Sequence, residues 1–287
     1  MEQQFKTHIS AEHKLLDLHI RETLQYRDLI FLLVKKNFTA QYKQTVLGPA
    51  WAVINPLLTT FVFTIVFGNL AKLTTADVPG DFVLPNFLFF MIGTITWNLF
   101  SSTLSMTSRT FIDNRKVMEK VYYPRLVQPL ATALSCLISF GIQFALFACL
   151  WAYYYFQGET SIQITPMILM LPVLIVHTLV LAIGLGTILS AVTTKYRDLT
   201  MLVSFGLQLW RFVSPAVYGL QLVPAAYLTI YQLNPIASIL EIMRTAVFGF
   251  GYFNLTFYAI SWAVSLALFF IGLVMFSRIE RTFMDTI

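Results

Sequence analysis

The sequence predicts an all-α polytopic membrane protein with six transmembrane helices, an N-terminal interfacial amphipathic helix and two re-entrant half-helices between the fifth and sixth spans. Of the 287 residues, 57% are hydrophobic and only 11% are charged, and the mean hydropathy is +0.71. Soluble domains contain about 25% charged residues. Lipid must therefore be the solvent for most of this chain.

Charge-free apolar stretches recur along the chain at the length that crosses the hydrocarbon core as a helix, about 20 residues. They predict spans at residues 49–71, 82–108 (beginning after Pro85), 126–156, 166–194, 199–218 and 255–277. Arg211 interrupts the fifth of them. The polar segment 1–21 lacks the apolar core of a signal peptide, so we expect the first span to drive insertion.

The segment 219–254 is apolar, but it is divided into pieces too short to span. Pro224, Asn234-Pro235, Gly249 and Gly251 break it. Short apolar helices persist at membrane depth only where protein or a water-filled cavity covers their ends. We therefore expect two re-entrant half-helices, 224–232 and 235–248, entering from the outer side; a surface loop is the alternative.

The basic residues predict the orientation. With six spans and the N-terminus inside, 16 of the 19 Lys and Arg residues fall on the cytoplasmic side, and only Lys72, Arg211 and Arg244 lie elsewhere. The positive-inside rule favours this arrangement. Both termini are then cytoplasmic, in a multi-pass protein of a bacterial cytoplasmic (inner) membrane.

Residues 1–48 form a cytoplasmic segment before the transmembrane domain, 49–287. Within it, the run 29–34 is too short to cross, and Lys35 and Lys36 follow it. This pattern predicts an amphipathic helix lying in the cytoplasmic interface, with its lysines toward anionic headgroups. The alternative is a soluble helix, but Gly48-Pro49 leads directly into the first span.

The sequence contains no recognisable catalytic machinery. No Gly-rich phosphate-binding loop ending in Gly-Lys-Ser/Thr occurs, and the spans contain essentially no Asp or Glu for an ion relay. Cys136 and Cys149 suggest neither a disulfide framework nor a metal site. His177 stands alone in the fourth span, where we expect packing or hydrogen bonding between helices. Either the chain conducts passively, or a partner supplies the energy.

Two cytoplasmic connections are candidate docking sites for such a partner. Residues 109–125 predict a short amphipathic helix ended by Pro124, which can dock in a groove of a cytoplasmic protein or lie on lipid headgroups. A tight charged turn joins the fourth and fifth spans. The candidate coupling residues in these two connections are Arg115, Lys116, Val117, Glu119, Lys120, Tyr122, Tyr196, Arg197 and Asp198.

Several short motifs together resemble one family. They are Tyr26-Arg27-Asp28-Leu29, the run Gln41-Tyr42-Lys43-Gln44-Thr45-Val46-Leu47-Gly48-Pro49-Ala50-Trp51, Asn55-Pro56-Leu57, Lys120-Val121-Tyr122-Tyr123-Pro124, Tyr196-Arg197-Asp198-Leu199, Ser214-Pro215-Ala216-Val217-Tyr218 and Asn234-Pro235. In this order they resemble the permease subunits of type-2 ABC exporters. The resemblance is closest to the branch that exports O-antigen, teichoic acid and related polysaccharides.

This resemblance implies a six-span permease that pairs with a second copy of itself and with two separate ABC ATPase subunits. ATP and Mg²⁺ would bind to the ATPases, so no cofactor is expected in this chain. The loop 109–125 would be the coupling helix, the half-helices 219–254 an outer gate, and the pathway would run between the two copies. We expect a lipid-linked glycan as substrate, contact with membrane lipids, and no nucleic acid.

Three charges at membrane depth are candidates for the gate, because a charge facing lipid costs about 2.5–3.5 kcal/mol. In one hypothesis, Glu241 offsets the positive charge of Arg211 or Arg244 near the gate. In the other, Glu241 and Arg244 simply pair with each other along one helix. The aromatic pathway candidates are Trp51, Trp97, Trp210 and Tyr218. These rings can stack on sugars or anchor the protein at the interface.

The function that the sequence predicts is the membrane subunit of an ATP-driven exporter of a lipid-linked polysaccharide. Export of a drug or another amphiphile is the alternative within the family. A passive channel and a membrane-embedded glycosyl- or acyltransferase are alternatives from other classes, and the latter lacks the carboxylates it would need at the membrane surface. The glycan, its lipid carrier and any carbohydrate-binding domain of the ATPase are not encoded in this sequence in readable form.

Overall fold

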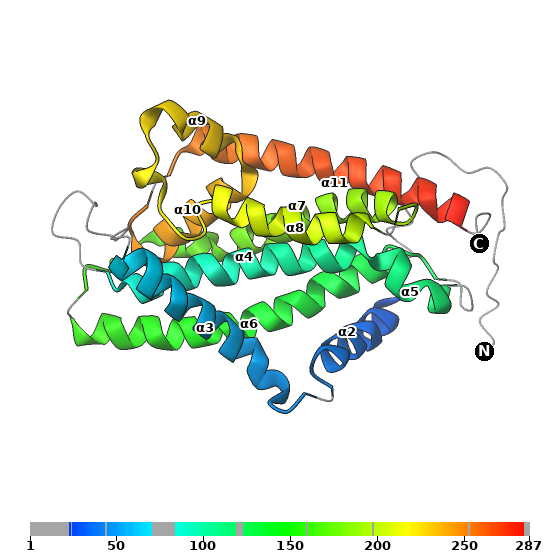
Figure 1. Ribbon diagram of the computed structural model, residues 1–287, viewed down its shortest axis with the longest axis horizontal. Helices are drawn as coiled ribbons and strands as arrows, with labels where there is room; N and C mark the ends of the chain where they lie inside the picture. Colours follow the sequence, from blue (N-terminus) through cyan, green and yellow to red (C-terminus); the bar gives the residue numbers. More distant parts are fainter. Residues whose placement is uncertain are drawn as a thin grey trace, which may run out of the picture.

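The computed structural model describes residues 23, 25–43, 45–70, 84–118, 123–158, 160–196, 198–251 and 253–283, with the side chains of residues 116 and 279–283 left undescribed. Over these ranges the chain folds into helices, 3-10 and π turns and loops, with no strand. Long helices lie side by side along the long axis of the molecule (Figure 1). This confirms the predicted all-α class for the described residues.

The helices follow the order predicted from hydropathy. Their bounds are α2 Arg27–Tyr42, α3 Trp51–Phe63, α4 Asn86–Ser108, α5 Thr110–Met118, α6 Val127–Gln157, α7 Leu171–Thr193, α8 Leu199–Val213, α9 Ala225–Leu233, α10 Pro235–Phe248 and α11 Leu255–Phe283. A 3-10 turn, Gly48–Ala50, precedes α3, and a π-helical stretch, Thr64–Leu70, follows it. Another 3-10 turn, Pro166–Met170, precedes α7.

Within the part of the chain that the structure describes, five helical segments are long and apolar enough to cross a membrane. They are Gly48–Leu70, Asn86–Ser108, Val127–Gln157, Pro166–Thr193 and Leu255–Arg278. They coincide with the first, second, third, fourth and sixth predicted spans. The chain is therefore a multi-pass membrane protein by the length and composition of its helices.

The predicted fifth span, 199–218, is wrong in its extent. The helix α8 ends at Val213, five residues before the predicted end. Pro215 explains the early end, because a proline disfavours the helical conformation in the residue before it, and Ser214 is extended at φ −98° and ψ 148°. At 1.5 Å per residue, α8 is about 22 Å long, which is shorter than the hydrocarbon core of about 30 Å.

The helix α4 is the centre of the bundle. In its most apolar 18-residue window, 78% of the residues are buried, against 17–33% in the other four candidate spans. It packs against α3, α6, α7 and α10, and its side chains Leu88, Phe90, Ile92 and Phe100 belong to the main hydrophobic core. α11 reaches this core mainly through its packing on α7.

Small residues allow α7 to approach its neighbours closely. A Cβ placed on Gly184 would lie 2.7 Å from backbone atoms of Phe269 in α11, and one on Gly186 would lie 2.6 Å from Cβ of Thr107 in α4. Helices in membranes associate through such close packing, because lipid gives them no hydrophobic reason to do so. On the same helix, His177 Nε2 lies 3.0 Å from Ser265 Oγ of α11, and the ring stacks on Trp262. The structure confirms the interhelical role that the sequence suggested for His177.

The N-terminal helix α2 packs against the first turns of α6. Ile30, Leu33 and Val34 are buried there, in a second core that also includes Val127 and Ala131. Phe31 and Leu32 remain exposed, at 67% and 62%. The helix is therefore apolar on two sides, one covered by α6 and one open to the surroundings.

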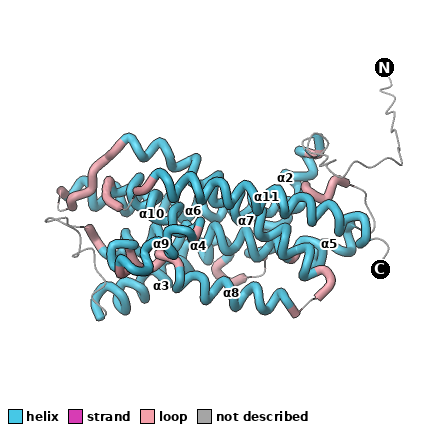
Figure 2. The backbone as a smooth tube through the Cα atoms, turned by 90° about the horizontal axis from the view of Figure 1, so that it is seen from above, coloured by secondary structure: helices cyan, strands magenta, loops and turns pink. Residues whose placement is uncertain are grey.

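The region between α8 and α11 forms two short helices, as the sequence predicted. The first, α9, covers 225–233 against a predicted 224–232, and the second, α10, has the predicted bounds, 235–248. Asn234 is the extended residue between them, at φ −71° and ψ 113°. Gly249 ends α10 in the left-handed conformation, at φ 73°. α10 is buried along its whole length, and α9 lies across the end of the bundle (Figures 1 and 2).

We expect Gly184→Ala to destabilise the protein by roughly 1–3 kcal/mol, because the added methyl group meets the backbone of α11 and cannot be absorbed by a side-chain rotation. The measurement is the midpoint of thermal unfolding in detergent, followed by size-exclusion chromatography. Gly141→Ala in α6 is the matched control, since nothing lies within 4 Å of the position its Cβ would take. Equal midpoints for the two variants would contradict the close packing of α7 on α11.

Candidate functional site

A cavity of about 760 Å³ opens between four helices, α3, α4, α6 and α8, next to the end of α2. Its lining residues are Gln41, Tyr42, Thr45, Trp51, Ala52, Asn55, Pro56, Trp97, Asn98, Leu99, Ser101, Ser102, Ser105, Met106, Cys136, Ser139, Phe140, Gln143, Ser204, Leu207, Gln208 and Arg211. Carboxamide and hydroxyl side chains make up just over half of this list, and apolar side chains make up most of the rest. The cavity lining is therefore mixed, with polar groups contributed by every helix that forms it.

The polar lining follows from helical spacing. On α8, Ser204, Gln208 and Arg211 recur at intervals of four and three residues and therefore share one face. The opposite face of α8 is apolar and exposed, with Leu202 and Phe205 at 61% and 58% exposure. α8 thus separates the polar cavity from an apolar environment.

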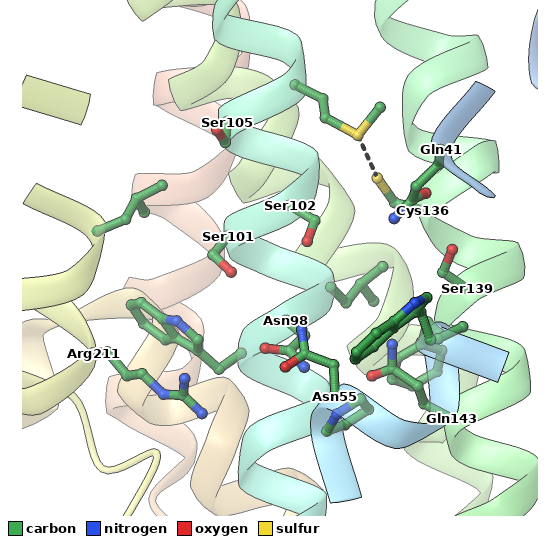
Figure 3. Close-up of a pocket in the computed structure, with 18 of the residues that line it drawn as sticks. Gln41, Asn55, Asn98, Ser101, Ser102, Ser105, Cys136, Ser139, Gln143 and Arg211 are labelled. Carbon is green, nitrogen blue, oxygen red and sulfur yellow. Dashed lines mark hydrogen bonds between the residues drawn. The ribbon is translucent and has the colours of Figure 1, made fainter. Parts of the chain in front are cut away.

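On α4, the cavity residues also fall on one face. Asn98, Ser101, Ser102 and Ser105 follow one another along the helix, and Figure 3 shows the three serines in a row beyond Asn98. Asn55 of α3 lies next to Asn98 in the same view, and Gln143 of α6 lies on the far wall. Hydroxyl and carboxamide groups therefore meet in the cavity from three helices.

The cavity has one formal charge, and it is positive. Arg211 is the cation, and none of the lining residues is an Asp or a Glu. Figure 3 shows the guanidinium projecting from α8 toward Asn98 and Asn55. The site therefore favours a neutral or anionic polar ligand over a cation.

Three buried polar atoms of this lining have no hydrogen-bond partner among the described residues. They are Ser139 Oγ, Gln143 Oε1 and Arg211 Nε. Buried polar groups are almost always hydrogen-bonded, because leaving one unpaired costs about 1–3 kcal/mol. Because these three atoms have almost no accessible surface, they lie behind the open wall of the cavity, and a ligand would reach them only after a side-chain movement.

The contacts of Arg211 within the protein are weak. Its Nη2 lies 3.4 Å from Thr94 Oγ1, which is a long hydrogen bond. Its guanidinium carbon lies 4.8 Å from the centroid of the Phe63 ring, a cation–π contact. No described carboxylate pairs with it, so the hypothesis that Glu241 offsets Arg211 is wrong.

Glu241 pairs with Arg244 instead. Arg244 Nη1 donates to Glu241 Oε1 at 2.7 Å, and both side chains are only 1% exposed. This confirms the simpler sequence hypothesis, in which two residues three apart on α10 pair along the helix. A buried pair of this kind is maintained only where further hydrogen bonds satisfy its remaining donors and acceptors.

Those further bonds come from the turn after α8. We call Glu241, Arg244 and their partners in this turn the arginine clamp. Arg244 donates to the carbonyl oxygens of Tyr218, at 2.9 Å, and Ala216, at 3.2 Å, and its guanidinium carbon lies 4.1 Å from the Phe89 ring centroid. The backbone N–H of Leu220 donates to Glu241 Oε1 at 3.2 Å. The clamp thus holds the segment 214–220 against α10 and α4.

A glycine of α4 makes the clamp possible. A Cβ on Gly93 would lie 2.2 Å from the carbonyl oxygen of Ala216 and 3.0 Å from Arg244 Nη2. Only glycine leaves room for both groups at this point of α4. The sequence gives no sign of this contact, because Gly93 reads as an ordinary small residue of a membrane helix.

The aromatic candidates are distributed over several environments. Trp51 and Trp97 line the cavity, although Trp97 is only 3% exposed. Trp210 does not line it; its ring packs edge-on against Trp97 and Phe100. Tyr218 lies in a separate recess with two further tyrosines of α9. Of the seven predicted gate or pathway residues, three therefore share the cavity: Trp51, Trp97 and Arg211.

The predicted coupling connections lie at the opposite end of the bundle from α9 and α10, next to the end of α11 (Figures 1 and 2). The predicted amphipathic helix is present as α5, residues 110–118. Its Phe111 is buried and stacks on Phe276 of α11, while Val117 is 38% exposed. Arg109 and Asp113 form an exposed ion pair at 3.3 Å.

Several coupling candidates cannot be placed further. Glu119, Lys120, Tyr122 and Arg197 lie outside the described residues, as does the side chain of Lys116. Arg115 is half-buried on α5. In the second connection Tyr196 is 51% exposed, with Lys195 Nζ lying 5.3 Å from its ring centroid, and Asp198 immediately precedes α8.

The sequence reasoning missed the carboxamide and serine lining. Asn55, Asn98, Gln143, Gln208 and the serines of α4 are uncharged, so a search for charges and aromatic residues passes over them. A signal was available, because Ser204, Gln208 and Arg211 share one helical face in an otherwise apolar segment. Polar residues placed this way inside spans mark a protein-facing or water-facing surface.

Apolar helices around a polar, acid-free cavity define an integral membrane protein of the transport class. A comparison with family models is consistent with this class, since residues 28–248 match the model described as ABC-2 type transporter. The match covers most of the chain. The protein therefore belongs to the ABC-2 type transporter family and is a transport permease.

The similar curated proteins share one name. A protein of Klebsiella pneumoniae called O-antigen export system permease protein RfbA is 24% identical over 272 residues, which cover 94% of this chain and 99% of the relative. A protein of the same name from Myxococcus xanthus is 30% identical over 224 residues, covering 77% of this chain and 80% of the relative. The similarity therefore extends over nearly the whole length of both chains.

We expect Arg244→Gln and Glu241→Gln each to destabilise the protein by about 3–5 kcal/mol, because either change leaves its partner charged, buried and unpaired. The loss of stability in the double variant should be smaller than the sum of the two single losses by about 1–3 kcal/mol. Thermal unfolding midpoints in detergent test this order.

Arg109→Gln is the matched control for this cycle, because its ion pair with Asp113 is exposed and should contribute less than about 1 kcal/mol. Strictly additive effects of Glu241→Gln and Arg244→Gln would show that the two side chains are not coupled in the folded protein.

Proposed function

We propose that this chain is the membrane-spanning subunit of an ATP-driven exporter that moves a lipid-linked cell-surface polysaccharide across the bacterial cytoplasmic membrane. The observation that supports the substrate class best is the similarity, over most of the chain, to proteins named O-antigen export permeases. The lining of the cavity agrees with it. Carboxamides, hydroxyls and tryptophan faces suit sugar hydroxyls and sugar rings, whereas an apolar drug would leave these groups unpaired.

The energy for export comes from a partner in this proposal. Two ATPase subunits bind ATP and Mg²⁺, and α5 with the turn at 195–198 receives their movement on the cytoplasmic side. The exposed Val117 and Tyr196 are side chains that such a partner can cover. Basic residues at 115, 116 and 120 supply the charges for docking.

The topology that we propose has six spans, with both termini in the cytoplasm. α8 is the fifth and shortest span, and the turn at 214–220 completes its path to the outer side. α9 and α10 then enter from the outer side as re-entrant half-helices and form the outer gate. The burial of α10 on every face supports this assignment, because a half-helix at membrane depth must be covered by protein.

A second copy of the chain completes the transporter in this proposal. The faces of α3 and α8 that point away from the cavity are apolar and exposed, with Phe61 of α3 at 56% and Leu202 and Val213 of α8 at 61% and 56%. A pathway between two copies would place these faces against the partner or against lipid. The cavity of each copy would then open beside that pathway.

We expect reversal of the three basic coupling residues (Arg115→Glu, Lys116→Glu and Lys120→Glu together) to abolish both co-purification of the ATPase subunits and ATP-dependent export. The reason is repulsion where the proposal requires attraction. Lys72→Glu is the control, because the proposed topology places this lysine on the outer side. Export and ATPase binding that survive the triple reversal would remove α5 from the coupling route.

The six-span topology predicts opposite sides for the two ends of α8. In a background with Cys136→Ala and Cys149→Ala, a membrane-impermeant maleimide should label Lys195→Cys only from the cytoplasmic side. It should label Tyr227→Cys, at an exposed position of α9, only from the outer side. Labelling of both cysteines from one side would mean that α8 does not span.

A further inference from the structure

We infer that the cavity binds an anionic oxygen group, a phosphate ester or a carboxylate, attached to the hydroxyl-rich chain, with Arg211 as its counter-charge. The inference rests on the proposed function in one respect: the hydroxyl-rich chain is the exported glycan. It adds a charge requirement on the substrate and a residue that enforces it.

The two arginines near the turn after α8 differ in how well they are satisfied. Arg244 has a carboxylate at 2.7 Å, two carbonyl oxygens at 2.9 and 3.2 Å and an aromatic face at 4.1 Å. Arg211 has one long hydrogen bond to Thr94, at 3.4 Å, and one ring contact, to Phe63. The Nε atoms of both arginines are buried without a partner among the described residues, so the difference between the two lies in their terminal nitrogens. The first arginine is structural, and the second has donors to spare.

Those spare donors face the cavity. Figure 3 shows the Arg211 guanidinium projecting toward Asn98 and Asn55 rather than packing along α8. A guanidinium presents donors in a fixed planar fork that matches the oxygens of a phosphate or a carboxylate. The two asparagines can donate further hydrogen bonds to the same group through their amide nitrogens.

The rest of the cavity suits the chain that bears the anion. Ser139 Oγ and Gln143 Oε1 are unpaired on the far wall, and the serines of α4 extend the polar surface away from Arg211. The volume, about 760 Å³, is within the range of small-ligand sites. No lining carboxylate competes for Arg211 or attracts a cation.

The test uses the complex of this chain with its ATPase subunits in nanodiscs of phosphatidylcholine, without nucleotide. Equilibrium dialysis with labelled maltose and labelled maltose 1-phosphate gives the ratio of their affinities. We expect the phosphate ester to bind about tenfold more tightly, and Arg211→Gln to reduce this ratio to about one. Arg211→Lys should retain part of the preference, because it keeps the charge and loses the planar fork.

Two further variants separate the effect of the Arg211 charge from a general loss of sugar binding. Asn98→Leu should weaken the binding of both sugars. It should change the ratio of their affinities less than Arg211→Gln does. Arg27→Gln removes an exposed arginine at the start of α2, whereas only the opposite end of α2 lines the cavity, so this variant should leave the ratio unchanged. A ratio of one in the wild type, or a ratio that Arg211→Gln leaves intact, would overturn the inference. If Arg211→Gln does not fold, the wild-type ratio and the Arg211→Lys ratio decide.

A lipid headgroup is the other possible source of the anion. Adding phosphatidylglycerol to the nanodiscs should not displace maltose 1-phosphate; displacement that depends on Arg211 would overturn the assignment to the glycan. The proposed function has a separate readout, ATP-dependent export and ATPase co-purification. A transporter that exports with ATP but binds both sugars equally would defeat this inference alone, whereas a chain that recruits no ATPase would defeat the function.

Discussion

The buried ion pair of Glu241 and Arg244 determines the geometry of the end of the molecule that contains α9, α10 and the turn after α8. A charged pair this deep needs further hydrogen bonds, and the turn after α8 supplies three of them, while Arg244 Nε has no partner among the described residues. The same turn presses the carbonyl oxygen of Ala216 onto Gly93 of α4. The end of α8 is thereby fixed to the central helix, and so is the position from which Arg211 reaches the cavity.

The two faces of α8 explain how an apolar bundle can enclose a polar cavity. Water or a polar solute can lie at membrane depth only where protein covers it from lipid. The α8 face with Ser204, Gln208 and Arg211 provides one wall of that cover, and α4 with its asparagine and serines provides another. Because only Leu207 of α8 is buried, this wall has few packing contacts to lose if it shifts. α4 is its opposite, since it is buried along most of its length.

Hydropathy and proline positions were enough to predict most of the fold. The start of α4 after Pro85 and the bounds of α10 follow directly from local rules, because proline begins helices well and interrupts them badly. The extent of α8 was predicted less well, since apolar residues continue past Val213 and conceal the effect of Pro215. The cavity could not be predicted in full, because its walls come from helices far apart in sequence. The ion pair of Glu241 with Arg244 could be predicted from the sequence, because both residues belong to one helix. The hydrogen bonds that join this pair to residues 216–220 could not be predicted.

The distribution of charge distinguishes the cavity from the end of the bundle that contains α5 and the turn before α8. Within the described residues, the lining of the cavity contains a single cation and no acid, while basic residues gather near α2, α5 and the turn before α8. In the proposed transporter the partner ATPases supply the energy, which then reaches the cavity through helices that extend from one end of the bundle to the other. α8 begins at one candidate docking turn, after Asp198, and ends beside the arginine clamp, while α4 ends at Ser108 next to the other docking connection. A force on that turn would reach Arg211 along a single short helix.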